Sequence, residues 1–79
     1  MQISKSALKA LRRMPRTMAQ RFLAAFDRLE ADDTEGLDIK PLKGRDGYLR
    51  LRIGRYRAIY TITMELVVVR VGPRGDVYH

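Results

Sequence analysis

Arginines that alternate with apolar residues are the side chains best suited to chemistry in this sequence. Over residues 48–53, Arg50 and Arg52 alternate with apolar residues, and Arg57 continues the pattern after a two-residue break. A period of two is typical of a strand with one buried and one solvated face, so these guanidinium groups should share the solvated face. Because the rigid fork of arginine suits phosphate better than lysine does, this face is a candidate anion-binding surface.

The break at Gly54 and Arg55 predicts how the two strands pair. Glycine in the first position of a two-residue loop suits a type II′ hairpin. That register places Arg52 directly opposite Arg57, and like charges at such positions destabilise a sheet by roughly 0.2–1 kcal/mol. A fold that tolerates this cost should bind an anion there. The other expected pairs are Ile53 with Tyr56, Leu51 with Ala58, Arg50 with Ile59 and Leu49 with Tyr60.

A third strand is predicted over residues 66–71, after a loop at Met64 and Glu65. If that loop also has two residues, Arg70 joins the basic face opposite Ile59. The apolar face then consists of Leu49, Leu51, Ile53, Tyr56, Ala58, Tyr60, Ile62, Val67, Val69 and Val71.

The last residues supply further candidates. Residues 72–75 predict a turn that contains Arg74, and Tyr78 follows shortly after it, so both could lean back over the basic face. In the plainer interpretation Arg74 only satisfies loop carbonyls and Tyr78 only caps the edge of the core. His79 is expected to be frayed, and Asp76 is expected to fix the turn or an arginine rather than to act as a base.

Two helices are predicted ahead of the sheet, over residues 5–13 and 15–31. Ser4 or Ser6 could cap the first, and Pro15 separates the two. The second has one apolar stripe, formed by Met18, Phe22, Ala25, Phe26 and Leu29. Because both phenylalanines lie in mid-stripe, we expect them in the core rather than in a platform for nucleobases.

These elements predict a single α+β domain over residues 1–79. An N-terminal helical hairpin packs on a small, mostly antiparallel sheet of three to four strands. Residues 1–3 are too short for a convincing strand, and residues 37–42 are expected to be an extended connector. The main strands are expected over residues 48–53, 56–62 and 66–71.

The net charge of +7 is unevenly distributed. Residues 1–41 hold eight basic and six acidic residues, whereas residues 42–79 hold eight basic and three acidic residues. The positive excess therefore lies on the sheet. A small basic domain most often binds nucleic acid, less often an acidic protein or an anionic membrane. Charge that serves only solubility is the plainer alternative.

Composition also indicates what the chain lacks. There is no cysteine and only one histidine, at the end, so neither a disulfide nor a protein zinc site is expected. The acidic run at residues 32–36 is expected to be a solvated loop rather than a metal site, and no cofactor is expected. No segment approaches a membrane span or the apolar core of a signal peptide, which favours a cytoplasmic location.

Three segments in a fixed order carry a family resemblance: PLKG at residues 41–44, YLRLRIGRYRAIY at 48–60 and VGPRGDVY at 71–78. With them, nearly the whole chain resembles RelE-type toxins of the RelE/ParE toxin–antitoxin superfamily. The resemblance implies a RelE-like fold and a toxin that cleaves mRNA in the ribosomal A site without a metal. The implied reaction is attack of a ribose 2′-hydroxyl on the adjacent phosphate, which leaves a 2′,3′-cyclic phosphate.

The resemblance also implies roles for particular residues. Arg74 would hold the transition-state phosphate, Arg57 would bind a flanking phosphate, and Tyr78 would be the general acid or base or would stack on a base. Arginine forks can stabilise such charge without a metal, and crowded positive charge favours a tyrosine phenolate. The catalytic set is thus Arg57, Arg74 and Tyr78, and the expected RNA-binding set is Lys43, Arg50, Arg52 and Arg70.

Two departures from the family pattern bear on this interpretation. The strand that usually precedes the first helix is reduced to residues 1–3, and Tyr48 stands where one lysine of a pair is expected.

Two alternative functions remain: a ParE-like inhibitor of DNA gyrase with the same fold, and an inactive or purely RNA-binding relative. The expected partners are a cognate antitoxin, the ribosome and mRNA, and the antitoxin should be acidic where it crosses the basic sheet.

Overall fold

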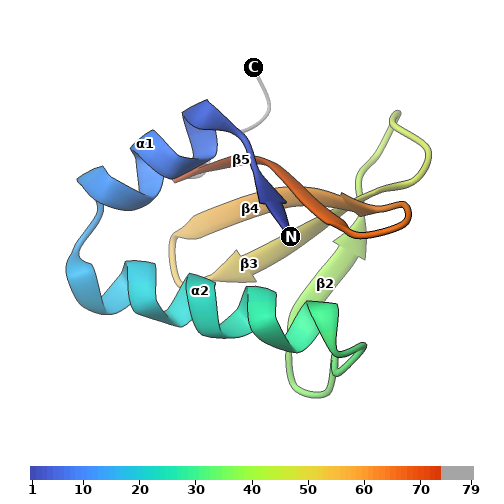
Figure 1. Cartoon of the computed structure of the whole chain (residues 1–79), viewed down its shortest axis with the longest axis horizontal. Coiled ribbons are helices and arrows are strands. Elements are labelled where there is room, and N and C mark those ends of the chain that lie inside the picture. The colour runs from blue at the N-terminus through green and yellow to red at the C-terminus, as the bar shows by residue number, and fades with distance from the viewer. Residues whose placement is uncertain (74–79) are drawn as a thin grey trace.

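The computed structural model describes residues 1–73, which form two helices on one side of a five-stranded sheet (Figure 1). The strand order is β1-β5-β4-β3-β2; β1 runs parallel to β5, and the other neighbours are antiparallel. No helix in this part of the chain has the length and apolar character needed to cross a membrane. The elements are β1 (Gln2–Ile3), α1 (Lys5–Arg13), α2 (Arg16–Glu30), β2 (Asp38–Pro41), β3 (Tyr48–Ile53), β4 (Tyr56–Ile62) and β5 (Leu66–Pro73).

The β3–β4 hairpin has the predicted register. Arg52 pairs with Arg57, and Ile53 pairs with Tyr56 across the loop. Gly54 has a φ of +59°, whereas Arg55 is not left-handed, which is the combination that a type II′ turn requires. Because a slip of one residue would turn every side chain to the other face, this loop decides which residues meet the helices.

The sheet is larger than the predicted three to four strands. Residues 2–3 do form a short strand, β1, beside β5. The expected connector at residues 37–42 contains β2, which pairs with β3 along its whole length. Both strands lie at sheet edges, where the sequence signal is weak: two residues carry no periodicity, and a proline such as Pro41 is tolerated only at an edge.

A β-bulge changes which residues of β5 face the core, so the predicted pattern of buried residues has to be corrected. The register shifts after Ile59, so that Tyr60 pairs with Val68 rather than with Val69. The prediction that β5 simply alternates is therefore wrong beyond this point. The buried residues of β5 include Leu66, Val68 and Val71, whereas Val67 and Val69, predicted on the apolar face, are half-buried.

Ser4 joins this bulge to the first helix. Its hydroxyl donates to the carbonyl oxygen of Val69 at 2.7 Å and accepts from the backbone N–H of Ala7 at 3.1 Å, while its own backbone N–H donates to the carbonyl of Val68 at 2.9 Å. Of the two candidate caps, Ser4 is thus the one that caps α1. The irregular carbonyl of the bulge gains a hydrogen bond, and α1 is fixed to β5.

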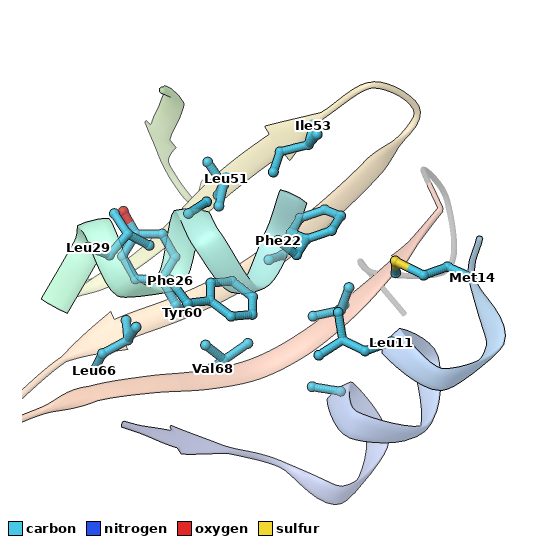
Figure 2. Packing of buried hydrophobic residues seen from close by; sticks show 14 residues of the cluster. Leu11, Met14, Phe22, Phe26, Leu29, Leu51, Ile53, Tyr60, Leu66 and Val68 are labelled. Atoms are coloured by element: carbon cyan, nitrogen blue, oxygen red, sulfur yellow. The ribbon is translucent and has the colours of Figure 1, made fainter. Parts of the chain in front are cut away.

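The helices pack on the sheet more than on each other. α1 lies along β5, whereas α2 crosses β3 and β5, so the predicted helical hairpin is only a loose one (Figure 1). α2 begins at Arg16 rather than at residue 15, because Pro15 takes the capping position. Phe22 and Phe26 are fully buried, with ring centroids 6.0 Å apart, and pack with residues of the sheet (Figure 2). Their predicted core role is confirmed.

The acidic run at residues 32–36 is exposed, as predicted. One of its aspartates, Asp33, forms an ion pair with Arg28. Asp33 accepts two hydrogen bonds from the Arg28 guanidinium, at 3.0 and 3.1 Å, and these bonds lower the pKa of the Asp33 carboxyl. Arg28 also donates to the carbonyl oxygen of Glu35. The run therefore folds back on the last turn of α2.

Replacing Gly54 with alanine should destabilise the fold by about 1–2 kcal/mol, because an L-residue strains at this left-handed φ. The new methyl group would also lie 3.4 Å from the Met18 side chain. Urea denaturation followed by circular dichroism measures the change. The matched control is Arg55→Ala in the second loop position, which should stay within about 0.5 kcal/mol of wild type. Equal stability of both variants would contradict the assigned turn.

Candidate nucleic-acid interface

The side of the sheet opposite the helices collects the basic residues of the central strands. Arg50 pairs with Ile59 and Ile59 with Arg70, and in the neighbouring row Arg52 pairs with Arg57. The predicted basic face is thus present in the register expected for it. We call this surface the open face, since the helices of residues 1–73 pack on the other side. It carries Asp38, Lys40, Tyr48, Arg50, Arg52, Arg57, Ile59 and Arg70.

A pocket of about 330 Å³ lies on the open face. Lys40, Lys43, Arg50 and Arg57 line it together with Pro41 and Leu42, and no carboxylate is among these lining residues. Cations gathered in a concave site raise the local concentration of an anion. Guanidinium forks also match the oxygens of a phosphate in a bidentate manner. The pocket is therefore suited to a phosphate group.

Arg50 is the most buried of these cations. Its residue is only 8% exposed, and its guanidinium Nη2 lies 2.8 Å from Oδ1 of Asp38 on β2. Asp38 is itself about half exposed, with 48% of its side chain accessible. The ion pair orients Arg50 and compensates the cost of burying its charge. The sequence placed Arg50 on a solvated face and did not predict this burial.

Lys40 is the pocket residue that sequence reasoning missed. It lies on β2 directly opposite Arg50, so its side chain shares the open face. The signal was present, because Asp38 and Lys40 alternate with Leu37 and Ile39. Treating residues 37–42 as a connector concealed that alternation. Lys43, in contrast, was predicted and does line the pocket from the β2–β3 loop.

The predicted RNA-binding residues fall into two groups. Lys43 and Arg50 line the pocket, whereas Arg52 and Arg70 lie outside it. The Nε of Arg52 donates to the carbonyl oxygen of Gly54 at 3.1 Å, and Arg52 lines a separate depression of about 340 Å³ with Arg21 and Arg28. That hydrogen bond draws the guanidinium toward the hairpin loop and eases its repulsion from Arg57. Arg70 is exposed on β5 and lines neither depression.

An aromatic residue, Tyr48, follows the β2–β3 loop at the start of β3. The guanidinium carbon of Arg45 lies 4.1 Å from the centroid of the Tyr48 ring. Tyr48 is half-buried and opens β3, opposite Thr61 of β4. In Figure 1 this loop is the yellow-green segment that stands out from the ends of β2 and β3.

Two of the three predicted catalytic residues, Arg74 and Tyr78, lie outside the described residues, so Arg57 is the member of the set whose position is known. Tyr60 does not replace Tyr78 as a proton donor on the open face. It faces the core, is 1% exposed, and burial raises the pKa of its hydroxyl (Figure 2). Residues 1–73 also contain no group of three His, Cys, Asp or Glu side chains that could hold a metal ion.

Comparisons with known proteins agree over nearly the whole chain. A family model described as the ParE toxin of the type II toxin–antitoxin system parDE matches residues 1–78. A protein of Methanocaldococcus jannaschii named "Putative toxin RelE1" is 31% identical, over 98% of this chain and 91% of that protein.

Solved structures of relatives share the fold. The structure of the RelB–RelE antitoxin–toxin complex from Methanococcus jannaschii matches with a TM-score of 0.84 at 25% identity, over 99% of this chain and 95% of that one. The archaeal RelE–RelB complex from Pyrococcus horikoshii matches with a TM-score of 0.76 at 32% identity, over 94% and 92% of the two chains. The chain is therefore a RelE-type toxin and belongs to the ParE toxin family of type II toxin–antitoxin systems.

Proposed function

We propose that this toxin cleaves mRNA on the ribosome without a metal ion and so inhibits translation. The observation that carries the proposal is the pocket on the open face, where four cationic residues of the described part of the chain converge: Lys40, Lys43, Arg50, which is also paired with Asp38, and Arg57. Such a pocket suits the RNA backbone, whose charge lies on its phosphates. The RelE names of its relatives support the same activity.

The reaction needs charge stabilisation more than it needs a protein nucleophile. The 2′-oxygen of a ribose loses its proton and bonds to the adjacent phosphorus. The bond from phosphorus to the 5′-oxygen of the next nucleotide breaks, and that oxygen takes up a proton. The products are a 2′,3′-cyclic phosphate and a free 5′-hydroxyl. Negative charge on the phosphoryl oxygens rises in the transition state, where fixed guanidinium groups stabilise it best.

Within this proposal each residue has a distinct role. Arg57 binds a flanking phosphate from the pocket, and Arg74 stabilises the transition state. Tyr78 transfers a proton or stacks on a base. Arg50, held by Asp38 at 2.8 Å, enters the reaction already oriented, so little order has to be created when RNA binds. Lys43 lies in the pocket, and Arg52 and Arg70 bind the RNA backbone on either side of it.

A cognate antitoxin is the proposed protein partner. The relatives from Methanococcus jannaschii and Pyrococcus horikoshii were solved as RelB–RelE complexes. A partner that neutralises this toxin would need acidic residues over the open face, where Arg50, Arg57 and Arg70 lie. The description of the matching family as ParE keeps a second function open, inhibition of DNA gyrase on the same fold.

Brief induction of the toxin in cells should produce cuts within translated codons of a reporter mRNA, seen by primer extension. Arg57→Ala should reduce cutting, because it removes a phosphate contact in the pocket, and adding Arg74→Ala should reduce it by roughly a further 10²–10³-fold, the usual cost of removing one transition-state donor. Arg55→Ala is the matched control, because it removes the same charge from the hairpin loop outside the pocket. It should cut like wild type.

Other outcomes of that experiment are informative. Growth arrest with intact mRNA would contradict the nuclease function and favour inhibition of DNA gyrase. The absence of both growth arrest and mRNA cleavage would favour an inactive relative. Equal loss of cutting in Arg55→Ala and Arg57→Ala would show that general charge, rather than the pocket, carries the activity.

Binding of a neighbour-encoded acidic antitoxin should weaken as salt rises, because screening reduces the attraction to exposed charges. Calorimetric titration at two salt concentrations measures this effect. The variant Arg50→Gln, Arg57→Gln should bind more weakly and lose part of the salt dependence, while Arg55→Gln should not. Affinity that is independent of salt would rule out an antitoxin that recognises the basic face.

A further inference from the structure

We propose that Tyr48 is a stacking platform for one unpaired base of the bound RNA, beside the phosphate pocket. The inference rests on the proposed function, since it concerns RNA held on the same face. It assigns a binding role to a residue that otherwise only opens β3. Its ligand is a nucleobase of single-stranded RNA.

Tyr48 is the only aromatic residue on the open face within residues 1–73. Phe22, Phe26 and Tyr60 are buried in the core, and Tyr56 packs against the core from the apolar side of β4. Aromatic rings are the usual partners of splayed bases in single-stranded RNA. The described residues therefore offer one ring for this purpose on the face that carries the cations.

The position of the ring matches that of the pocket. Tyr48 and Arg50 lie two residues apart on the same face of β3, which separates them by about 6.6 Å along the strand. Arg50 lines the pocket, and Lys43 of the adjoining loop lines it as well. One nucleotide can span this distance, so a phosphate in the pocket and a base on Tyr48 can belong to the same strand.

The backbone that carries the ring is already fixed. The N–H of Leu42 donates to the carbonyl of Tyr48 at 2.9 Å, and the N–H of Tyr48 donates to the carbonyl of Arg45 at 3.2 Å. The hydroxyl of Thr61 donates to the carbonyl of Gly47 at 2.7 Å and ties this loop to β4. Little backbone freedom is therefore lost at this position when a base stacks on the ring.

Arg45 occupies the place that a base would take. Its planar guanidinium lies 4.1 Å from the centre of the Tyr48 ring, and Arg45 is exposed. An exposed cation over an aromatic ring contributes about 0.5–1 kcal/mol, whereas a base on such a ring contributes about 1–3 kcal/mol. A base therefore displaces Arg45, whose charge then remains beside the RNA backbone.

The test compares two short single-stranded RNA oligonucleotides, one with all bases and one fully abasic, which carry the same backbone charge. Wild type should bind the first roughly 5- to 150-fold more tightly, as measured by fluorescence anisotropy. Tyr48→Leu keeps an apolar side chain and should lose most of this preference. Tyr48→Phe should keep it, which also separates stacking from any role of the hydroxyl in proton transfer.

Arg45→Ala is the matched control. It should weaken binding of both oligonucleotides through the lost charge, while the preference for bases is kept or increased, because a base no longer has to displace Arg45 from the ring. A preference that survives in Tyr48→Leu would overturn the stacking platform while leaving RNA binding in place. Binding of neither oligonucleotide by wild type would overturn both the platform and the RNA-binding function.

A second measurement needs no variant of Tyr48. An oligonucleotide that carries the fluorescent base 2-aminopurine should be quenched when wild type binds it, because stacking on an aromatic ring quenches this base. Saturable binding without quenching at any labelled position would contradict the proposal, even if Tyr48→Leu failed to fold.

Discussion

The register of the β3–β4 hairpin is the constraint on which the rest of this structure depends. A strand presents alternate residues to opposite faces, so the two-residue loop at Gly54 and Arg55 decides at once what meets the helices and what does not. With this loop, Leu51 and Ala58 join Phe22 in the core. The same geometry sends the arginines to the other side. The turn at Gly54 and Arg55 thus determines both the composition of the core and the position of the cationic surface.

The open face brings like charges together and uses local contacts to hold them. Arg52 and Arg57 are directly opposite, yet the Nε of Arg52 bonds to Gly54 and directs that guanidinium toward the loop. Arg50 is buried and paired with Asp38, which fixes its orientation. These contacts limit the repulsion between arginines without cancelling the positive excess. A bound phosphate would reduce it further, so anion binding and local stability favour the same arrangement.

Strong periodicity made the centre of the fold predictable from the sequence. The alternation around Arg50 and Arg57 and the glycine of the loop gave the register, and the apolar stripe of α2 placed Phe22 in the core. The edges were missed, because β1 is too short for a pattern and β2 ends in a proline. The bulge in β5 carries a hydrogen bond from Ser4, a residue distant in sequence, and no local pattern reveals such a contact. Lys40 was missed together with its strand, and the roles of Arg74 and Tyr78 stay predictions.

The proposed cleavage requires the RNA 2′-hydroxyl, because the pocket residues within residues 1–73 supply cations to the phosphate and the attacking oxygen comes from the RNA itself. We would translate an mRNA in a reconstituted system with the toxin, using either an all-ribose message or one with a single 2′-deoxynucleotide at the mapped cut. Cleavage should disappear at the substituted position only, and the all-ribose product should end in a 2′,3′-cyclic phosphate. Cleavage that persists at the deoxynucleotide would contradict catalysis by charge stabilisation on the open face and would require a different nucleophile.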